Sequence, residues 1–189
     1  MGPAFESANS NNNRVRERLK LLLKSHAHEL APVVFEAKEG DLLLRQGAEA
    51  EQILLLTEGC VAIQVRQADQ QPHTLTILEA ETLLGEIGLF GNGQHAADVR
   101  VVQGPAKLIA VAGDQLLQAM LFDADLAIEL LALLSQRCLQ GNALMSLLLD
   151  GIHAAHGGDA ALLEQTCQAL QQHDHSLAAA AEKLAALHR

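Results

Sequence analysis

The spacing of apolar residues changes twice along the chain, and each change predicts a different kind of structure. Over residues 15 to 30, apolar side chains recur every three or four positions, which predicts an amphipathic helix that Pro32 ends. From 33 to 111, short apolar runs are separated by glycines, a pattern typical of a sandwich or barrel. The predicted strands cover 33–37, 41–45, 53–57, 61–66, 74–78, 97–102 and 107–111.

Helical spacing returns after Ala112. We expect a short helix at 114–121, and Asp123 or Asp125 is expected to cap a longer helix over 123–150. The longer helix has two apolar faces, so one is expected to cover the barrel and the other a second copy of the chain. In the alternative, this helix packs only within its own chain. The candidate dimer contacts are Ala127, Leu131, Leu134, Cys138, Met145 and Leu148.

These elements predict an α+β fold with a mainly β core. The core is expected to be a jelly-roll barrel or sandwich of about eight strands. An N-terminal helix precedes it, a long helix follows it, and a short helical tail ends the chain. The expected divisions are a disordered lead at 1–13, a barrel domain with its N-terminal helix at 14–122, the long helix at 123–150 and a tail at 151–189. Two tail helices are expected, at 159–172 and 176–187.

Composition narrows the classes of function. The formal net charge is −10 and the basic residues crowd into 14–24, so we expect no DNA partner and interpret the basic run as a solvated helix face. Cys60, Cys138 and Cys167 are too few and too far apart for a disulfide framework or a cysteine metal site. No segment has the pattern of a signal peptide or a membrane span. We therefore expect a cytoplasmic protein without metal and without catalytic residues.

The most specific pattern is Gly-Glu-Ile-Gly-Leu-Phe at 85–90, followed by Gln-His-Ala-Ala-Asp-Val at 94–99. With the glycines at 40, 47 and 59 and the strand runs around them, this cassette resembles the cyclic-nucleotide-binding domain family. The family includes the sensor domain of the catabolite activator protein, protein kinase A regulatory subunits and cyclic-nucleotide-gated channels. The resemblance covers about 33–122 and implies a jelly-roll barrel that binds a small anionic ligand.

The resemblance also implies roles for individual residues. Backbone amides after Gly85 would face a cyclic phosphate, and Glu86 would accept a hydrogen bond from the ribose hydroxyl. An arginine would complete the site at the position where this chain has His95, which has an unperturbed pKa of about 6.5 and no guanidinium fork. Without the fork, His95 is expected to be a weaker, pH-dependent phosphate contact, a contact to another ligand, or an exposed loop residue. Glu86 is expected to be either a ligand contact or a surface or cap carboxylate. The candidate ligand residues are Gly85, Glu86, Ile87, Gly88, His95, Ala96 and Ala97.

Further departures from the family pattern point the same way. Ala96 replaces a hydroxyl residue, Glu81 replaces a glycine, and Asp98 is expected to add negative charge near the anion site. The tail does not resemble the winged helix-turn-helix through which transcription factors of the family bind DNA. These departures predict an anion site that is altered or abandoned.

Three hypotheses follow. The first is a non-catalytic regulatory module that binds a small anion, cyclic AMP or cyclic GMP among the candidates, weakly or in a modified way, and signals through the long helix. The second is a degenerate barrel that acts as a ligand-independent scaffold for dimerisation or protein docking. The third is a transcriptional regulator that contacts DNA through the basic helix of 14–24.

Overall fold

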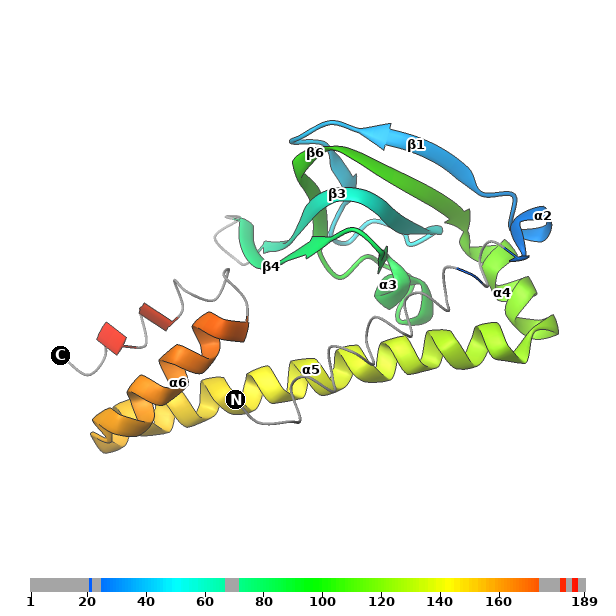
Figure 1. Cartoon of the computed structure of the whole chain (residues 1–189). Helices are drawn as coiled ribbons and strands as arrows, with labels where there is room; N and C mark the ends of the chain where they lie inside the picture. The colour runs from blue at the N-terminus through cyan, green and yellow to red at the C-terminus, as the bar shows by residue number, and fades with distance from the viewer. Residues whose placement is uncertain (1–20, 22–24, 67–71, 174–180, 183–184, 187–189) are drawn as a thin grey trace.

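The computed structural model describes residues 21, 25–66, 72–173, 181–182 and 185–186 (Figure 1). The disordered lead expected at 1–13, the basic segment of 14–24 apart from Leu21, and most of the helix expected at 176–187 lie outside the described residues. In the described part, a β-sheet lies against one very long helix, α5, and a shorter helix, α6, folds back along the far end of α5 (Figure 1).

The described strands form one antiparallel sheet that curls into an open barrel. Its path runs β1-β6-β3-β4, with β2 paired to β6 and β5 paired to β3, and its edge strands β1 and β4 do not pair with each other. The mainly β jelly-roll prediction is confirmed, except that the sheet is not closed. The strands are β1 Val33–Ala37, β2 Leu42–Leu44, β3 Gln52–Arg66, β4 Pro72–Glu79, β5 Thr82–Leu84 and β6 Asp98–Ala112.

The predicted count of about eight strands is too high, since the described residues contain six. The runs expected at 53–57 and 61–66 are one strand, β3, and those at 97–102 and 107–111 are one strand, β6. Gly59, with φ +91°, lies where the β3–β6 register shifts, and a Cβ there would be 2.8 Å from the Gln103 carbonyl oxygen. Such irregularities bend a strand without ending its pairing, so this glycine marks a bend within β3.

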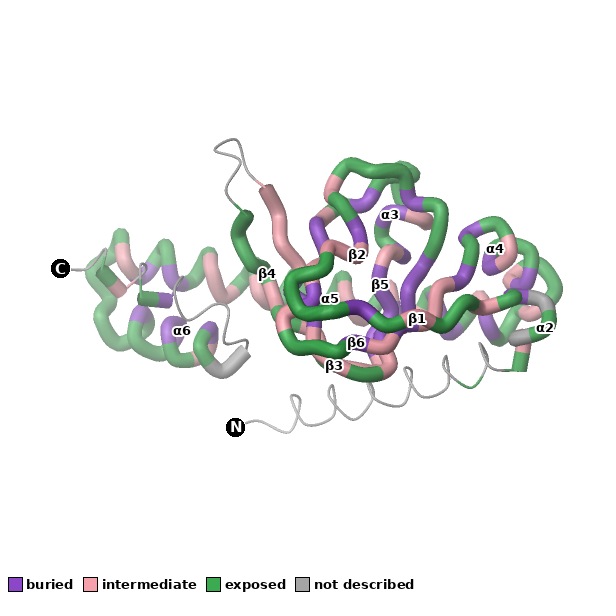
Figure 2. Tube along the Cα trace, turned by 90° about the horizontal axis from the view of Figure 1, so that it is seen from above, coloured by how far each residue is buried: buried purple, intermediate pink, exposed green. Residues whose placement is uncertain are grey.

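Two apolar cores meet at β3. Leu54 and Leu56 join the cluster inside the barrel, whereas Ile53 and Leu55 join a second cluster beneath it. Successive side chains of a strand point to opposite faces, and each face of this strand is covered by one of the clusters. The four-residue apolar run is therefore buried throughout (Figure 2). The second cluster also takes side chains from the helices α2, α4 and α5, so it attaches the helices to the barrel.

Along the chain, the helix α2 Ala27–Leu30 precedes the sheet. The helices α4 Gly113–Phe122, α5 Ala124–Gly157 and α6 Ala160–His173 follow it. A five-residue helix, α3 Glu86–Phe90, follows β5. Among the described residues, no helix combines the length and apolar character needed to cross a membrane.

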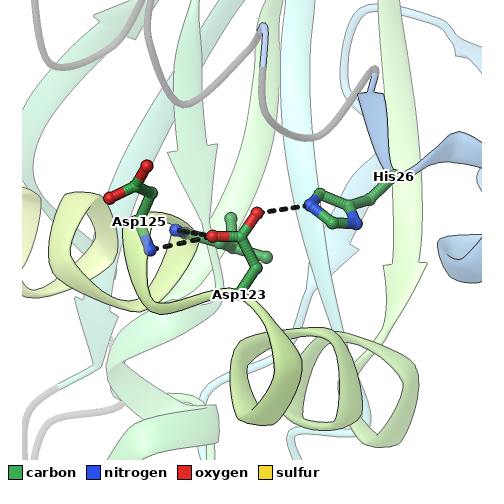
Figure 3. Close-up of polar contacts among 4 residues, drawn as sticks. His26, Asp123 and Asp125 are labelled. Atoms are coloured by element: carbon green, nitrogen blue, oxygen red, sulfur yellow. Dashed lines mark hydrogen bonds and ion pairs between the residues drawn. The ribbon is translucent and has the colours of Figure 1, made fainter.

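Asp123 caps α5, as one of the two predicted alternatives had it. Its Oδ1 accepts hydrogen bonds from the backbone amides of Asp125, at 2.8 Å, and Leu126, at 3.1 Å (Figure 3). Its Oδ2 lies 2.6 Å from Nε2 of His26, just before α2 (Figure 3). The hydrogen bond to His26 is the main reason why the pKa of Asp123 is lowered. This carboxylate therefore ties the N-terminal helix to the corner between α4 and α5.

The long helix ends at Gly157, seven residues beyond the predicted end at Asp150. Gly151, the first residue of the predicted tail, is instead a buried residue inside α5. The same part of α5 packs against α6, where Ala154 shares a cluster with Leu163 and Leu170. This packing offsets the weak helix propensity of glycine, and Gly158, with φ +71°, forms the C-cap instead.

Candidate ligand-binding site

A pocket of about 330 Å³ lies between the barrel and α5. Side chains from the strands, α3 and the loop before β6 form one wall, and Arg137, Gln140, Gly141 and Leu144 of α5 form the other. Most of the lining is apolar, and its titratable residues are Glu86, His95 and Arg137. A ligand in this pocket would touch the barrel and the long helix at the same time.

The structure brings the predicted ligand residues together around this pocket. The turn before α3 depends on Gly85, which has φ +90°, and a Cβ at this position would lie only 3.0 Å from the carbonyl oxygen of Gln52. The loop that separates the two halves of the cassette turns back on the first half through a hydrogen bond from the Gly93 amide to the Gly88 carbonyl, at 3.0 Å. The ligand role of the cassette stays a prediction. All of Gly85, Glu86, Ile87, Gly88, His95, Ala96 and Ala97 line the pocket.

Glu86 is not a surface carboxylate, because its side chain is only 1% exposed. It forms an ion pair with Arg137, whose Nη1 donates to Oε1 of Glu86. Nη2 of the same guanidinium donates to the Leu83 carbonyl oxygen at 2.6 Å. Arg137 thus crosses from α5 to the cassette and holds the residue that the family resemblance assigns to the ribose hydroxyl.

Arg137 is the charged residue of this pocket that sequence reasoning missed. The sequence contained one signal: Arg137 is the only lysine or arginine between Lys107 and Lys183, and it lies between the two leucine-rich runs of the predicted long helix. A lone cation on such a helix is a candidate for pairing with a buried carboxylate. Its partner is 51 positions away along the chain, so the pairing had no local pattern.

His95 is buried, which contradicts the expectation of an exposed loop residue. It is 7% exposed, its amide donates to the Ala48 carbonyl at 2.9 Å, and its carbonyl accepts from the Gly47 amide at 2.8 Å. Burial lowers the pKa of His95 below 6.5, because the charged imidazolium loses its hydration. Near neutral pH the ring is therefore uncharged and provides no cation for a phosphate.

Two of the four departures from the family pattern lie away from the pocket. Asp98 does not line it, since its Oδ1 accepts from the Gln46 amide at 2.7 Å and from Nη2 of Arg66 at 2.9 Å. Glu81 also lies outside the lining and adopts φ +67°, a left-handed conformation that suits the glycine of the family pattern. The expectation that Asp98 makes the anion site more negative is therefore wrong, and the site differs through His95 and Ala96.

Comparison with known proteins agrees with this geometry. The family description "Cyclic nucleotide-binding domain" matches residues 34–121. A curated relative, the cAMP-activated global transcriptional regulator CRP of Pasteurella multocida, is 26% identical over 113 residues, which is 60% of this chain and 52% of the relative. The chain thus spans about half the length of that relative.

Solved structures show the same fold. The sensor domain of the transcriptional regulator DNR from Pseudomonas aeruginosa superposes with a TM-score of 0.56 at 23% identity, covering 70% of this chain and 91% of that one. FixK2 from Bradyrhizobium japonicum superposes with a TM-score of 0.54 at 16% identity, covering 62% of this chain and 57% of that one. Fold, cassette and family match agree: residues 34–121 of this chain match the cyclic nucleotide-binding domain family.

Proposed function

We propose that this chain is a non-catalytic regulatory module that binds a small anionic ligand between its barrel and α5 and passes occupancy along that helix. One observation carries the proposal: α5 supplies a wall of the pocket that the cassette residues line. A ligand shifts a conformational equilibrium only if it interacts differently with the two states. A ligand that touches both walls meets this condition whenever α5 moves relative to the barrel.

Cyclic AMP and cyclic GMP are the first ligands to test, since the family match and the cassette support a nucleotide. Binding is expected to be weak, because His95 replaces the phosphate-binding arginine and is uncharged. Losing a hydrogen bond to a charged group costs about 1.5–3 kcal/mol, which is roughly one to two decades in affinity. The pocket, at about 330 Å³, lies at the small end of the range typical for ligand sites.

The working form of the module is proposed to be a homodimer through α5. Of the predicted contacts, Leu131 and Met145 are each 61% exposed, and Cys138 is exposed as well, whereas Ala127, Leu134 and Leu148 are half-buried. An exposed row runs along α5 with steps of three, four or seven residues and includes three of the predicted contacts. It consists of Ile128, Leu131, Cys138, Met145, Leu149 and Ile152. A row of this kind is the usual seam of a two-helix contact.

The alternative proposal is a ligand-independent scaffold. The ion pair between Arg137 and Glu86 favours it, because this pair already fills the charged end of the pocket from within the chain. In a scaffold the pair would simply hold α5 against the barrel. The exposed row on α5 would then serve a partner regardless of any ligand.

Calorimetric titration of the chain with cyclic AMP and cyclic GMP, at pH 6 and pH 8, tests the regulatory proposal. We expect binding of at least one nucleotide and altered hydrogen exchange of α5 amides in the complex. Absence of both heat and thermal shift with either nucleotide would reject nucleotide sensing and favour the scaffold.

Light scattering tests the dimer. Leu131→Asp together with Met145→Asp is expected to give a monomer, while Leu121→Asp on α4, a residue that is 81% exposed, leaves the mass unchanged. A wild-type monomer at micromolar concentration would contradict the α5 dimer under both proposals.

A further inference from the structure

Among the described residues, the pocket lining has one permanently charged cationic side chain, and it comes from the helix. This part of the lining contains no lysine, and Arg137 is its only arginine. The imidazole of His95 stands where the family pattern places its arginine, and it is buried. An oxyanion that enters the pocket therefore meets a full positive charge on α5 and none on the barrel side.

We propose that Arg137 binds the oxyanion of the ligand from α5, in place of the missing cassette arginine, and gives up Glu86 in exchange. The inference rests on the proposed function, in that it assumes an anionic ligand in this pocket. It deepens that function because the anion would contact the signalling helix directly.

The position of the guanidinium suits this exchange. Nη2 is held by the Leu83 carbonyl at 2.6 Å, so the group keeps an anchor on β5 when Nη1 leaves Glu86. The side chain is 24% exposed, which leaves a route for an incoming anion. A guanidinium keeps its charge at any physiological pH and can meet two oxygens of a carboxylate or phosphate with its planar fork.

The exchange also restricts the ligand. Glu86 is 1% exposed, and a buried carboxylate that loses its ionic partner needs another hydrogen-bond donor. The ligand should therefore carry a hydroxyl or amide donor for Glu86 besides its oxyanion. The rest of its surface should be apolar, because Leu44, Ile63, Leu84 and Leu144 surround the charged end. A small phosphate ester and a small carboxylic acid share this chemistry.

Titrations of three variants test the proposal, with cyclic AMP as the phosphodiester probe and salicylate, which carries a hydroxyl, as the carboxylate probe. In Glu86→Gln the competing charge is removed at nearly constant shape, so we expect at least one probe to bind about tenfold tighter than to wild type. Arg137→Gln should weaken binding of the same probe by about ten- to a hundredfold. The affinity of Arg137→Lys for this probe should lie between those of wild type and Arg137→Gln, since lysine keeps the charge without the planar fork.

Arg66→Gln is the matched control. Arg66 also pairs with a buried carboxylate, that of Asp98, and lies outside the pocket lining. The affinity of the Arg66→Gln protein for the probe should stay within about twofold of that of wild type. Thermal unfolding of each variant establishes that it is folded at the titration temperature.

The pH profile separates Arg137 from His95, which lines the same pocket and carries a titratable imidazole. If Arg137 holds the anion, probe affinity should change little between pH 8 and pH 6.5, since the guanidinium does not titrate there. If His95 holds it, affinity should rise as the pH falls toward the pKa of the imidazole. A rise of this kind, retained in Arg137→Gln, would overturn the proposal.

The remaining outcomes are also decisive. The proposal is overturned if neither probe binds Glu86→Gln more tightly than wild type, or if the gain survives in the double variant Glu86→Gln, Arg137→Gln. If wild type binds no nucleotide but Glu86→Gln binds a probe through Arg137, the assignment of Arg137 stands while nucleotide sensing by the wild-type chain fails.

Discussion

Two arginine–carboxylate pairs in this protein have similar burial and different surroundings. Asp98 is 7% exposed and Glu86 is 1% exposed, while their partners Arg66 and Arg137 are 32% and 24% exposed. The first pair joins β3 to β6, which are hydrogen-bonded neighbours in one sheet. The second joins the barrel to α5 beside a pocket. The same chemistry therefore joins two strands of one sheet in the first place and joins the sheet to a helix in the second.

The supporting contacts make this difference concrete. Asp98 also accepts the Gln46 amide, and the Gln46 side chain in turn accepts the Arg66 amide at 2.7 Å, so the first pair belongs to a closed network of backbone and side chains. Arg137 reaches the barrel through Glu86, which lines the pocket, and through the Leu83 carbonyl. A ligand can compete for the second pair and has no access through the pocket to the first.

Truncating each of the two carboxylates should have the largest effect on stability. The two pairs should differ in how much they contribute to the free energy of unfolding. In Asp98→Ala the half-buried Gln46 amide loses its acceptor and Arg66 loses its partner, which should lower the free energy of unfolding by about 2–3 kcal/mol. Glu86→Ala should cost less, because Arg137 keeps the Leu83 carbonyl and faces the pocket. Urea unfolding of both variants measures the difference.

Asp98→Asn is the control for this comparison, since it keeps an acceptor for the Gln46 amide and should recover part of the loss. An Asp98→Ala protein as stable as wild type would show that the barrel pair contributes nothing. The contrast between the two pairs would then have no energetic basis.

Restoring the cassette arginine should have the next largest effect, which is on the affinity for cyclic AMP. His95→Arg adds a second fixed cation to the pocket, so cyclic AMP should bind about ten- to a hundredfold tighter than to wild type. His95→Gln, which adds no charge, is the control. Calorimetry that finds equal affinity for His95→Arg and His95→Gln would show that position 95 does not face the anion.

The smallest expected effect is a pH dependence of the stability that comes from His95. It distinguishes His95 from both arginines, which do not titrate near neutrality. Burial lowers the pKa of His95, so the unfolded chain takes up its proton first as the pH falls through 6.5. The stability that comes from the neutral ring is present above that pH and is lost as the pH falls from 6.5 to the lower pKa of the folded state. Because a single group titrates, this loss should be smaller than the loss in Asp98→Ala.

Melting temperatures at pH 7.5 and 5.5 check this prediction. Wild type should lose more stability over that interval than His95→Gln, and a variant of the exposed His153 on α5, His153→Gln, should behave like wild type. Equal losses in wild type and His95→Gln would show that the imidazole is not held in its neutral form by the fold.

Much of the fold could be predicted because it depends on local patterns. The alternation between Val33 and Val111 located the sheet, the spacing of three and four located α5, and the cassette located one side of the pocket. The strand count was too high because a glycine such as Gly59 can mark either a turn or a bend in a continuous strand, and only its pairing partners decide which.

The candidate site was predicted only in part, because its charges depend on contacts between distant residues. Glu86 and Arg137 are 51 positions apart, and Asp98 and Arg66 are 32 positions apart. Neither pairing leaves a periodic signal, so Asp98 was expected to add negative charge near the anion site, and Arg137 was assigned to no site.

By itself, the sequence determined the family, the barrel and the absence of an arginine at position 95, since these follow from residue identities and their spacing along the chain. Only the tertiary structure decided which residue supplies a positive charge to the pocket and that burial favours the neutral form of His95. Both depend on which groups exclude water from a side chain and which groups lie within hydrogen-bond distance of it. Those neighbours come from separate segments and are brought together only when α5 packs against the barrel.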